Sequence, residues 1–141
     1  MKKALSFICI ALCVATLQSC KKDSISVPNY PIEGLWIGTY DIVQAQESGG
    51  SFYYSFYIRN DDTLQVQGQG ADGNTYYGIG TWNLSSDSLF SGTITTTNLG
   101  QQGTVQNVSA VYDKKKGVLR NGRVESVGGF FISSFRLSRS N

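Results

Sequence analysis

The sequence contains no histidine, and of its 141 residues only two are prolines and three are cysteines. Without histidine the chain lacks the commonest general base and the commonest zinc ligand, and Ser-His and Cys-His nucleophiles are excluded. Carboxylates offer no obvious replacement, because Asp61 and Asp62 are neighbours in a turn whereas a glycosidase sets its two carboxylates across the substrate. We therefore predict no enzyme, no catalytic residue, no metal site and no cofactor. A carboxylate enzyme is only the third of three functional hypotheses.

An excess of charge of one sign is also absent. The chain has 12 basic and 10 acidic residues. Lys2 and Lys3 belong to an N-terminal leader, and what remains is formally neutral. A neutral domain lacks the basic footprint of a nucleic-acid-binding protein, so no nucleic-acid partner is predicted. The lysine run 114–116 precedes Gly117 and indicates a solvated hairpin turn.

The first twenty residues, in contrast, have the three parts of a secretory leader. Two lysines supply the positive start, residues 4–17 are apolar or small, and a Leu-Gln-Ser-Cys segment ends at Cys20. The apolar run is shorter than the roughly 20 residues of a membrane-spanning helix, and no later run is long enough. The whole segment resembles a bacterial lipoprotein signal peptide whose lipobox is residues 17–20. A secretory leader without lipid is the alternative.

The lipoprotein resemblance implies that residues 1–19 are a signal peptide and that Cys20 is the lipidation site. The Cys20 thiol would carry a diacylglyceryl group and the new amino terminus a further chain such as palmitate, which together hold stably to a membrane. Residues 20–31 would be the lipidated cysteine and a flexible tether. Lys21 and Lys22 do not resemble the aspartate-type signal for inner-membrane retention. We therefore expect a lipid anchor in the outer membrane of a bacterial cell envelope.

Removal of the leader also settles the cysteine chemistry of the mature protein. Cys9 and Cys13 leave with the signal peptide, and Cys20 becomes the lipid site. No cysteine is left for a disulfide or a thiol ligand. The domain that follows must be held together by packing alone.

Residues 32–141 are expected to form one β domain. Short runs rich in aromatic and β-branched residues alternate with turn clusters, and no helical periodicity of useful length occurs. Sequential hairpins favour an all-β, single antiparallel up-and-down barrel of about eight strands, and a two-sheet β-sandwich is the alternative. The predicted strands are 35–44, 52–59, 63–69, 76–84, 89–97, 104–112, 118–126 with a bend at 121–122, and 130–138.

A short motif in the first predicted strand suggests which barrel this is. Gly34 and Trp36 form a Gly-x-Trp sequence that resembles the opening of lipocalin-like (calycin) barrels. That resemblance implies that Trp36 packs across the closed end and that Arg136, or failing it Arg139, lies over its indole as a cation–π partner. The stretches 56–64 and 77–89 are similar to small lipocalin-like domains of bacterial lipoproteins.

Two binding functions follow from these patterns. The leading hypothesis is a monomeric, membrane-anchored, non-enzymatic barrel that binds a small apolar or amphipathic molecule or serves as an envelope interaction domain. The residues predicted to line its ligand site are Tyr54, Phe56, Val66, Ile79 and Ile94.

The second hypothesis is a sandwich-type carbohydrate-binding or adhesion domain that uses surface tyrosines. Its predicted contacts are Tyr53, Tyr57 and Tyr76. Ordinary β-propensity with cross-strand pairing is an alternative explanation for these tyrosines. Trp36 and Trp82 are predicted to be core residues, because buried aromatic rings usually serve packing.

Overall fold

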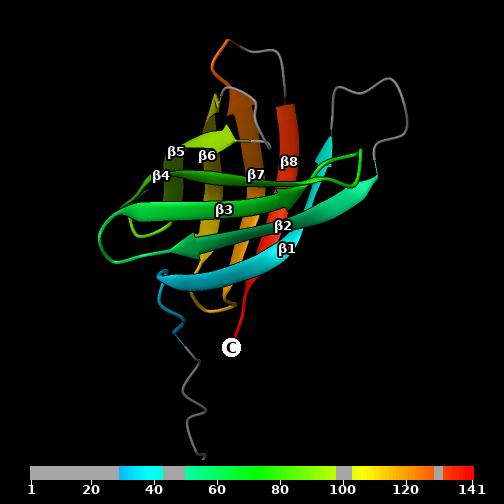
Figure 1. Cartoon of the computed structure of the whole chain (residues 1–141). Coiled ribbons are helices and arrows are strands. Elements are labelled where there is room, and N and C mark those ends of the chain that lie inside the picture. The colour runs from blue at the N-terminus through cyan, green and yellow to red at the C-terminus, as the bar shows by residue number, and fades with distance from the viewer. Residues whose placement is uncertain (1–28, 43–49, 98–102, 129–131) are drawn as a thin grey trace, which may run out of the picture.

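Eight antiparallel strands close into one barrel in the computed structural model (Figure 1), which describes residues 29–42, 50–97, 103–128 and 132–141. Each strand pairs with the next one in sequence, and the last strand returns to pair with the first. The strands are β1 (Gly34–Ile42), β2 (Ser51–Ile58), β3 (Thr63–Gln69), β4 (Thr75–Ser85), β5 (Leu89–Thr97), β6 (Thr104–Asp113), β7 (Val118–Ser126) and β8 (Ile132–Arg139).

The predicted single up-and-down barrel of about eight strands is therefore confirmed, and the two-sheet sandwich is not formed. The predicted ranges 63–69, 89–97 and 118–126 agree with the observed strands, and the other ranges differ at their ends. The predicted signal peptide and the lipidation site Cys20 lie outside the described residues. In the part of the chain that the structure describes, no helix is long and apolar enough to cross a membrane.

The interior of the barrel is filled by side chains from alternate positions of all eight strands. Tyr54, Phe56 and Ile58 on β2 are buried, whereas Tyr53 and Tyr57 are exposed, as a period of two requires. Inward-facing apolar side chains supply the main stabilisation of a domain without disulfides. The largest fully buried side chains are Trp36, Tyr54, Phe56, Phe90, Ile58, Leu64, Ile94, Leu119, Leu137 and Val108.

Close approach between neighbouring strands explains two of the glycines. A Cβ at Gly80 on β4 would overlap the carbonyl oxygen of Thr93 on β5. A Cβ at Gly38 on β1 would overlap the carbonyl oxygen of Arg136 on β8. Glycine at such points lets the sheet bend sharply enough to close into a small barrel.

Strand β7 contains the bend that its sequence predicts. The pairing register shifts between Leu119 and Gly122 on one side of β7, and Asn121 has a φ of 53°. Asparagine tolerates this left-handed conformation better than most residues. Gly122 leaves room for the ring of Phe135, its partner on β8, which lies over it.

The end of the barrel where β1 begins is closed by Trp36 and by the segment that precedes β1. Trp36 is fully buried, and its indole Nε1 donates a hydrogen bond to the carbonyl oxygen of Ile32 at 2.7 Å. The Tyr30 amide donates to the carbonyl oxygen of Lys114 at 3.0 Å, and the Tyr112 hydroxyl donates to the Tyr30 carbonyl. Residues 30–32 therefore lie across this end as part of the folded domain.

The arginine that lies over the Trp36 indole is Arg139. The prediction that Arg136 has this role was wrong. Arg139 pairs with Trp36 across β8 and β1, and its guanidinium carbon lies 5.9 Å from the centroid of the Trp36 ring. Arg136 lies an odd number of positions away, pairs with Thr39 and is exposed on the outer face. The period of two along β8 is the physical reason for the difference.

Trp82 is half-buried and packs against the core near the same end of the barrel. Its ring is stacked on Phe90 with centroids 6.3 Å apart, and its Nε1 donates to the carbonyl oxygen of Arg59 at 2.8 Å. The prediction that Trp82 packs with the core is therefore confirmed.

The two ends of the barrel differ in their connections. The closed end carries the turns after β2, β4 and β6, including the predicted lysine turn at 114–117. The opposite end carries the connections after β1, β3, β5 and β7, and we call it the open end. In Figure 1 the segment before β1 and the C-terminus lie together, at the closed end.

Candidate functional site

Three tyrosines from three strands meet inside the barrel toward its open end. Tyr40 comes from β1, Tyr54 from β2 and Tyr76 from β4. The ring centroids of Tyr40 and Tyr54 are 5.2 Å apart, and those of Tyr40 and Tyr76 are 6.4 Å apart. Edge-to-face and tilted contacts at these distances are favourable for aromatic pairs. We call these three residues the tyrosine cluster.

Glycines on the neighbouring strands make room for the cluster. Tyr54 pairs with Gly38 on β1 and with Gly68 on β3, so it has no side chain beside it at either position. The ring of Tyr76 lies over Gly68, its own partner on β3. A large ring that covers a glycine on the adjacent strand is a recurrent way of stabilising a bent sheet.

Phenylalanines surround the cluster and complete an aromatic interior. Tyr54 contacts Phe56 at 5.0 Å and Phe135 at 5.6 Å between ring centroids, and Phe56 and Phe135 are 5.2 Å apart. Phe52 lies 5.6 Å from Tyr40 and is only partly buried. The aromatic interior thus runs from the middle of the barrel to its open end.

One hydroxyl of the cluster has a clear hydrogen-bond partner. The Tyr40 hydroxyl donates to the carbonyl oxygen of Gln69 at 2.9 Å. The Tyr54 hydroxyl, in a side chain only 1% exposed, has no hydrogen-bond partner among the described residues. The buried Ser133 hydroxyl likewise has none there. An unpaired buried hydroxyl costs free energy and calls for an explanation.

Burial keeps all three phenols protonated. Burial raises the pKa of Tyr54 well above its usual 10.0, and the neighbouring Tyr40 raises it further. The pKa of Tyr76 is raised mainly by burial, and then by Tyr54 and Tyr40. For Tyr40, burial again raises the pKa, the neighbouring Tyr76 hydroxyl opposes the rise, and the carboxylate of Asp72 adds to it. The cluster therefore offers neutral hydroxyls at any physiological pH.

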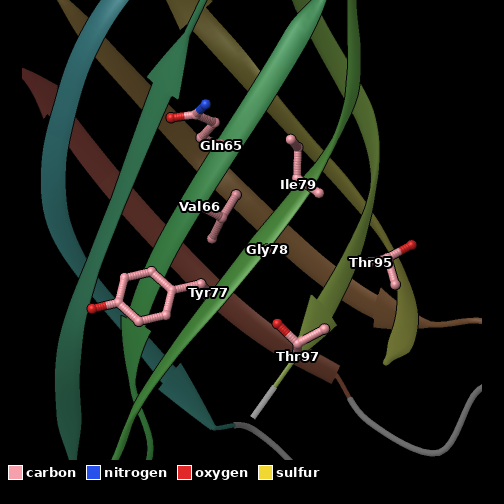
Figure 2. Close-up of a pocket in the computed structure, with 7 residues that line it drawn as sticks. All are labelled: Gln65, Val66, Tyr77, Gly78, Ile79, Thr95 and Thr97. Carbon is pink, nitrogen blue, oxygen red and sulfur yellow. The ribbon is translucent and has the colours of Figure 1, made fainter. Parts of the chain in front are cut away.

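Four of the five predicted ligand-site residues face this interior. Tyr54, Phe56, Val66 and Ile94 are all buried in the core. Ile79 is not with them: it is 59% exposed and lies on the outer face of β4, beside Tyr77 (Figure 2). The placement of Ile79 inside was wrong because it shares its parity on β4 with Tyr77, whereas Trp82 and Gly80 have the opposite parity.

The surface tyrosines of the second hypothesis are also divided by the structure. Tyr53 and Tyr57 lie on the outer face of β2. Tyr76 packs against the core inside the barrel, so the predicted trio does not share one surface. The alternation along β4 that places Trp82 inside also places Tyr76 inside, so the position of Tyr76 could have been predicted from the sequence.

Sequence reasoning missed Tyr40 and Phe135 as members of the site. Tyr40 shares its parity with Trp36 on β1, so it could have been placed inside by the same alternation. Phe135 shares the parity of Arg139 on β8, and which face of β8 points inward became known only with the register. The absence of a hydrogen-bond partner for the Tyr54 hydroxyl depends on packing, and no sequence pattern indicates it.

Known proteins support the fold but supply no family. No protein-family model matches the chain, and no curated protein matches it either. Solved structures that resemble it include a redesigned β-barrel, mFAP1, bound to DFHBI, with a TM-score of 0.58 and 21% identity over 76% of this chain and 94% of that one. A second redesigned β-barrel, b11L5F_LGL, has a TM-score of 0.55 and 21% identity over 77% and 91%.

The chain is a closed eight-stranded β-barrel. At 21% identity the likeness to these barrels shows the fold alone. What the interior can do has to be argued from its own side chains. Among the described residues no group of three or more His, Cys, Asp or Glu side chains could hold a metal ion. The tyrosine cluster offers flat apolar rings and neutral hydroxyls, which suit recognition.

Proposed function

We propose that this protein is a non-enzymatic envelope lipoprotein whose barrel binds a small, flat, uncharged apolar or amphipathic molecule at the open end. The observation that carries the proposal is the buried Tyr54 hydroxyl, which has no partner among the described residues. A ligand with one hydrogen-bond acceptor would satisfy that hydroxyl. The free energy recovered would be about 1 to 3 kcal/mol, the usual penalty for an unsatisfied buried polar group.

The surroundings of the hydroxyl support a flat apolar ligand. Among the described residues, Ile42, Phe52 and Tyr76 are only partly buried and pack against the core at the open end, so they form the outer edge of the described interior there. Aromatic and aliphatic walls with a few polar groups are typical of small-molecule sites. The similarity to mFAP1, a redesigned β-barrel bound to DFHBI, is consistent with ligand binding by a barrel of this fold.

The electrostatics of the interior favour a neutral ligand. The inward-facing side chains of the described residues at the open end are aromatic, aliphatic, hydroxyl or amide groups. Arg139, the cation that reaches the interior, contacts Trp36 at the closed end instead. An anionic ligand buried beside the cluster would have no counter-ion there, and burial of an unpaired charge is strongly unfavourable.

Ligand binding is tested first on the protein as it is purified. Native mass spectrometry after gentle purification should reveal a bound small molecule, and prodan, a flat and uncharged naphthalene ketone, serves as a fluorescent probe for the empty fraction. Tyr54→Phe should weaken prodan binding roughly tenfold, because the hydrogen bond to the ketone oxygen is lost while the ring remains. Tyr53→Phe is the matched control, since Tyr53 is the neighbouring tyrosine and faces outward. A protein that carries no ligand and binds no prodan would overturn the proposal.

Lipid anchoring rests on Cys20 and is tested separately. Metabolic labelling of the full-length protein with an alkyne analogue of palmitate should label the wild type. Cys20→Ser should abolish the label and Cys13→Ser should reduce it little, because Cys13 lies in the predicted signal peptide. Membrane fractionation should place the labelled protein in the outer membrane. Labelling that survives Cys20→Ser would contradict the anchor.

The fold would then fix how the barrel stands on the membrane. Tyr30 packs across the closed end, and residues 21–28 can reach no further than about 30 Å from the lipidated cysteine at roughly 3.5 Å per residue. The closed end would therefore lie nearest the lipid surface. The open end, with the tyrosine cluster, would point away from the membrane toward its ligand.

A further inference from the structure

A shallow groove of about 280 Å³ lies on the outer face of β3, β4 and β5. Figure 2 shows Tyr77 and Ile79 on β4, with Gln65 on β3 and with Thr95 and Thr97 on β5. The register confirms the arrangement, because Ile79 pairs with Gln65 and Thr95 while Tyr77 pairs with Gln67 and Thr97. These two rows of paired residues, which cross β3, β4 and β5, thus form one outward-facing surface.

Tyr77 and Ile79 are the outward-facing apolar side chains of the groove, and both are largely exposed. Tyr77 and Ile79 are each 59% exposed, more than Tyr53 or Tyr57 on the same outer face. Large apolar side chains that stand together on a surface mark an interaction site more often than scattered ones do. Nothing in the described part of the chain covers them.

The other outward-facing side chains of the groove are polar and uncharged. Gln65 contributes an amide, Thr95 and Thr97 contribute hydroxyls, and Tyr77 contributes a phenol at the edge of its ring. Among the described residues, the side chains of Gln65, Tyr77 and Thr95 have no hydrogen-bond partner. These donors and acceptors therefore stay available beside an aromatic face.

The charge of the outer surface is distributed unevenly around the barrel. The residues that pair with the groove residues on neighbouring strands are uncharged as well. They are Tyr57 on β2, Gln67 on β3 and Val105 on β6. The outer side of β7 and β8 instead carries Arg120, Arg136 and the ion pair between Arg123 and Glu125, whose N–O distance is 2.5 Å. A surface without charge complements a partner without charge.

Two other classes of partner fit this surface poorly. A peptide that binds by adding a strand needs an exposed sheet edge, and a closed barrel has none. An anionic lipid surface needs basic residues, which the groove lacks. Sugars, in contrast, present apolar C–H faces that pack on an aromatic ring and hydroxyls that pair with amides and hydroxyls.

We infer that the groove around Tyr77 and Ile79 is a binding site for a neutral polysaccharide. A hexose ring packs its C–H face on the Tyr77 ring and against Ile79. Its hydroxyls hydrogen-bond to the Gln65 amide and to the hydroxyls of Thr95 and Thr97. This site lies on the outside of the barrel and is separate from the ligand site at the tyrosine cluster.

Titration calorimetry of the full-length protein in mild detergent tests this inference, with maltohexaose, cellohexaose and mannohexaose as the probes. At least one of these neutral chains should bind, and Tyr77→Ala should weaken that binding roughly tenfold or more. Tyr53→Ala is the matched control, because it removes a tyrosine from the same outer face at a position outside the groove. Gln65→Ala should weaken binding by a smaller factor than Tyr77→Ala.

The outcomes separate this site from the interior one. Tyr54→Phe should leave hexose binding unchanged, and Tyr77→Ala should leave prodan binding unchanged. Wild-type affinity in a folded Tyr77→Ala variant would overturn the inference, as would the failure of all three hexose chains to bind. Equal losses in Tyr77→Ala and Tyr53→Ala would also overturn it, because the groove would then have no special role.

Discussion

The guanidinium carbon of Arg139 lies 5.9 Å from the centroid of the Trp36 ring, where β8 and β1 pair and close the barrel. The same guanidinium fills the space over Gly34, and it donates a hydrogen bond to the Glu33 carbonyl. Gly34 has a φ of 120°, a conformation that residues with a side chain rarely adopt. Arg139 therefore joins the start of β1 to the end of β8 over the tryptophan.

Replacement of Arg139 should reveal the strength of this junction. Arg139→Ala should lower the free energy of unfolding by about 1 to 3 kcal/mol, since a partly desolvated cation–π contact and a charge-assisted hydrogen bond are both lost. Arg136→Ala should change it by no more than about 0.5 kcal/mol, because Arg136 is exposed on the outer face. Urea denaturation followed by tryptophan fluorescence measures both, and equal effects would contradict the assignment.

Close strand packing at Gly80 should make this position intolerant of any side chain. Gly80→Ala should destabilise the fold by about 2 kcal/mol or more, because the new Cβ would overlap the Thr93 carbonyl oxygen and the backbone would have to shift. Gly50→Ala is the control, since a Cβ there would lie in ordinary contact with Phe52 at 3.4 Å. Thermal unfolding by circular dichroism compares the two variants. A Gly80→Ala protein as stable as the control would refute the close approach.

Removal of single hydroxyls from the tyrosine cluster should have effects of opposite sign. Tyr54→Phe should raise the stability of the ligand-free protein by about 1 kcal/mol, because it removes an unpaired buried hydroxyl and keeps the ring. Tyr40→Phe should lower it by about 1 kcal/mol, because the bond to the Gln69 carbonyl is lost. Chemical denaturation of both variants checks the pair. A loss of stability in both would show that Tyr54 has a partner after all.

The stability of the protein should fall at alkaline pH, because the buried phenols of the tyrosine cluster resist ionisation in the folded state. The folded pKa values of Tyr40, Tyr54 and Tyr76 are raised above the unfolded value of 10.0. Unfolded phenols therefore lose their protons first, and the unfolding free energy is intact below pH 10 and decreases as the pH rises above it. Denaturation between pH 8 and about pH 11 should show this decrease, and Tyr54→Phe should make it shallower. A pH-independent profile would contradict the burial of these phenols.

The bend in β7 should depend on the residue at position 121. Asn121 has a φ of 53°, so Asn121→Gly should be tolerated within about 0.5 kcal/mol, whereas Asn121→Val should cost about 1 to 2 kcal/mol. Thermal melts of the two variants provide the comparison. If valine were tolerated as well as glycine, the left-handed conformation would not be needed for the bend.

Much of this barrel could be predicted because alternation is a local property. For residues 63–69 and 89–97, the alternation of apolar and polar residues was sufficient to predict both the strand boundaries and the inward-facing side. On β4 the predictions of Ile79 inside and Tyr76 at the surface were wrong, because Tyr76 has the same parity as the inward-facing Trp82 and Ile79 has the opposite one. Arg136 and Arg139 could not be separated without the β1–β8 register, which joins opposite ends of the domain.

The candidate site was less predictable than the fold. Tyr54 could be placed in the interior, but its lack of a hydrogen-bond partner depends on how the side chains of other strands pack around it. The groove beside Ile79 could not be predicted without the register of β3, β4 and β5, which places residues of all three strands side by side. Contacts between distant strands carry this information, and no single run of residues contains it.

The order of the strands also bears on how the chain reaches its native state. Seven of the eight strand pairings join neighbours in sequence, whereas the pairing of β1 with β8 spans nearly the whole domain. Hairpins form quickly, and a contact of long sequence separation bears the largest loop-closure cost. Closure of the barrel between β1 and β8 is therefore expected late on the folding pathway. The indole of Trp36 then acts as a built-in reporter of that last step, and the Arg139 contact should slow unfolding more than it speeds folding.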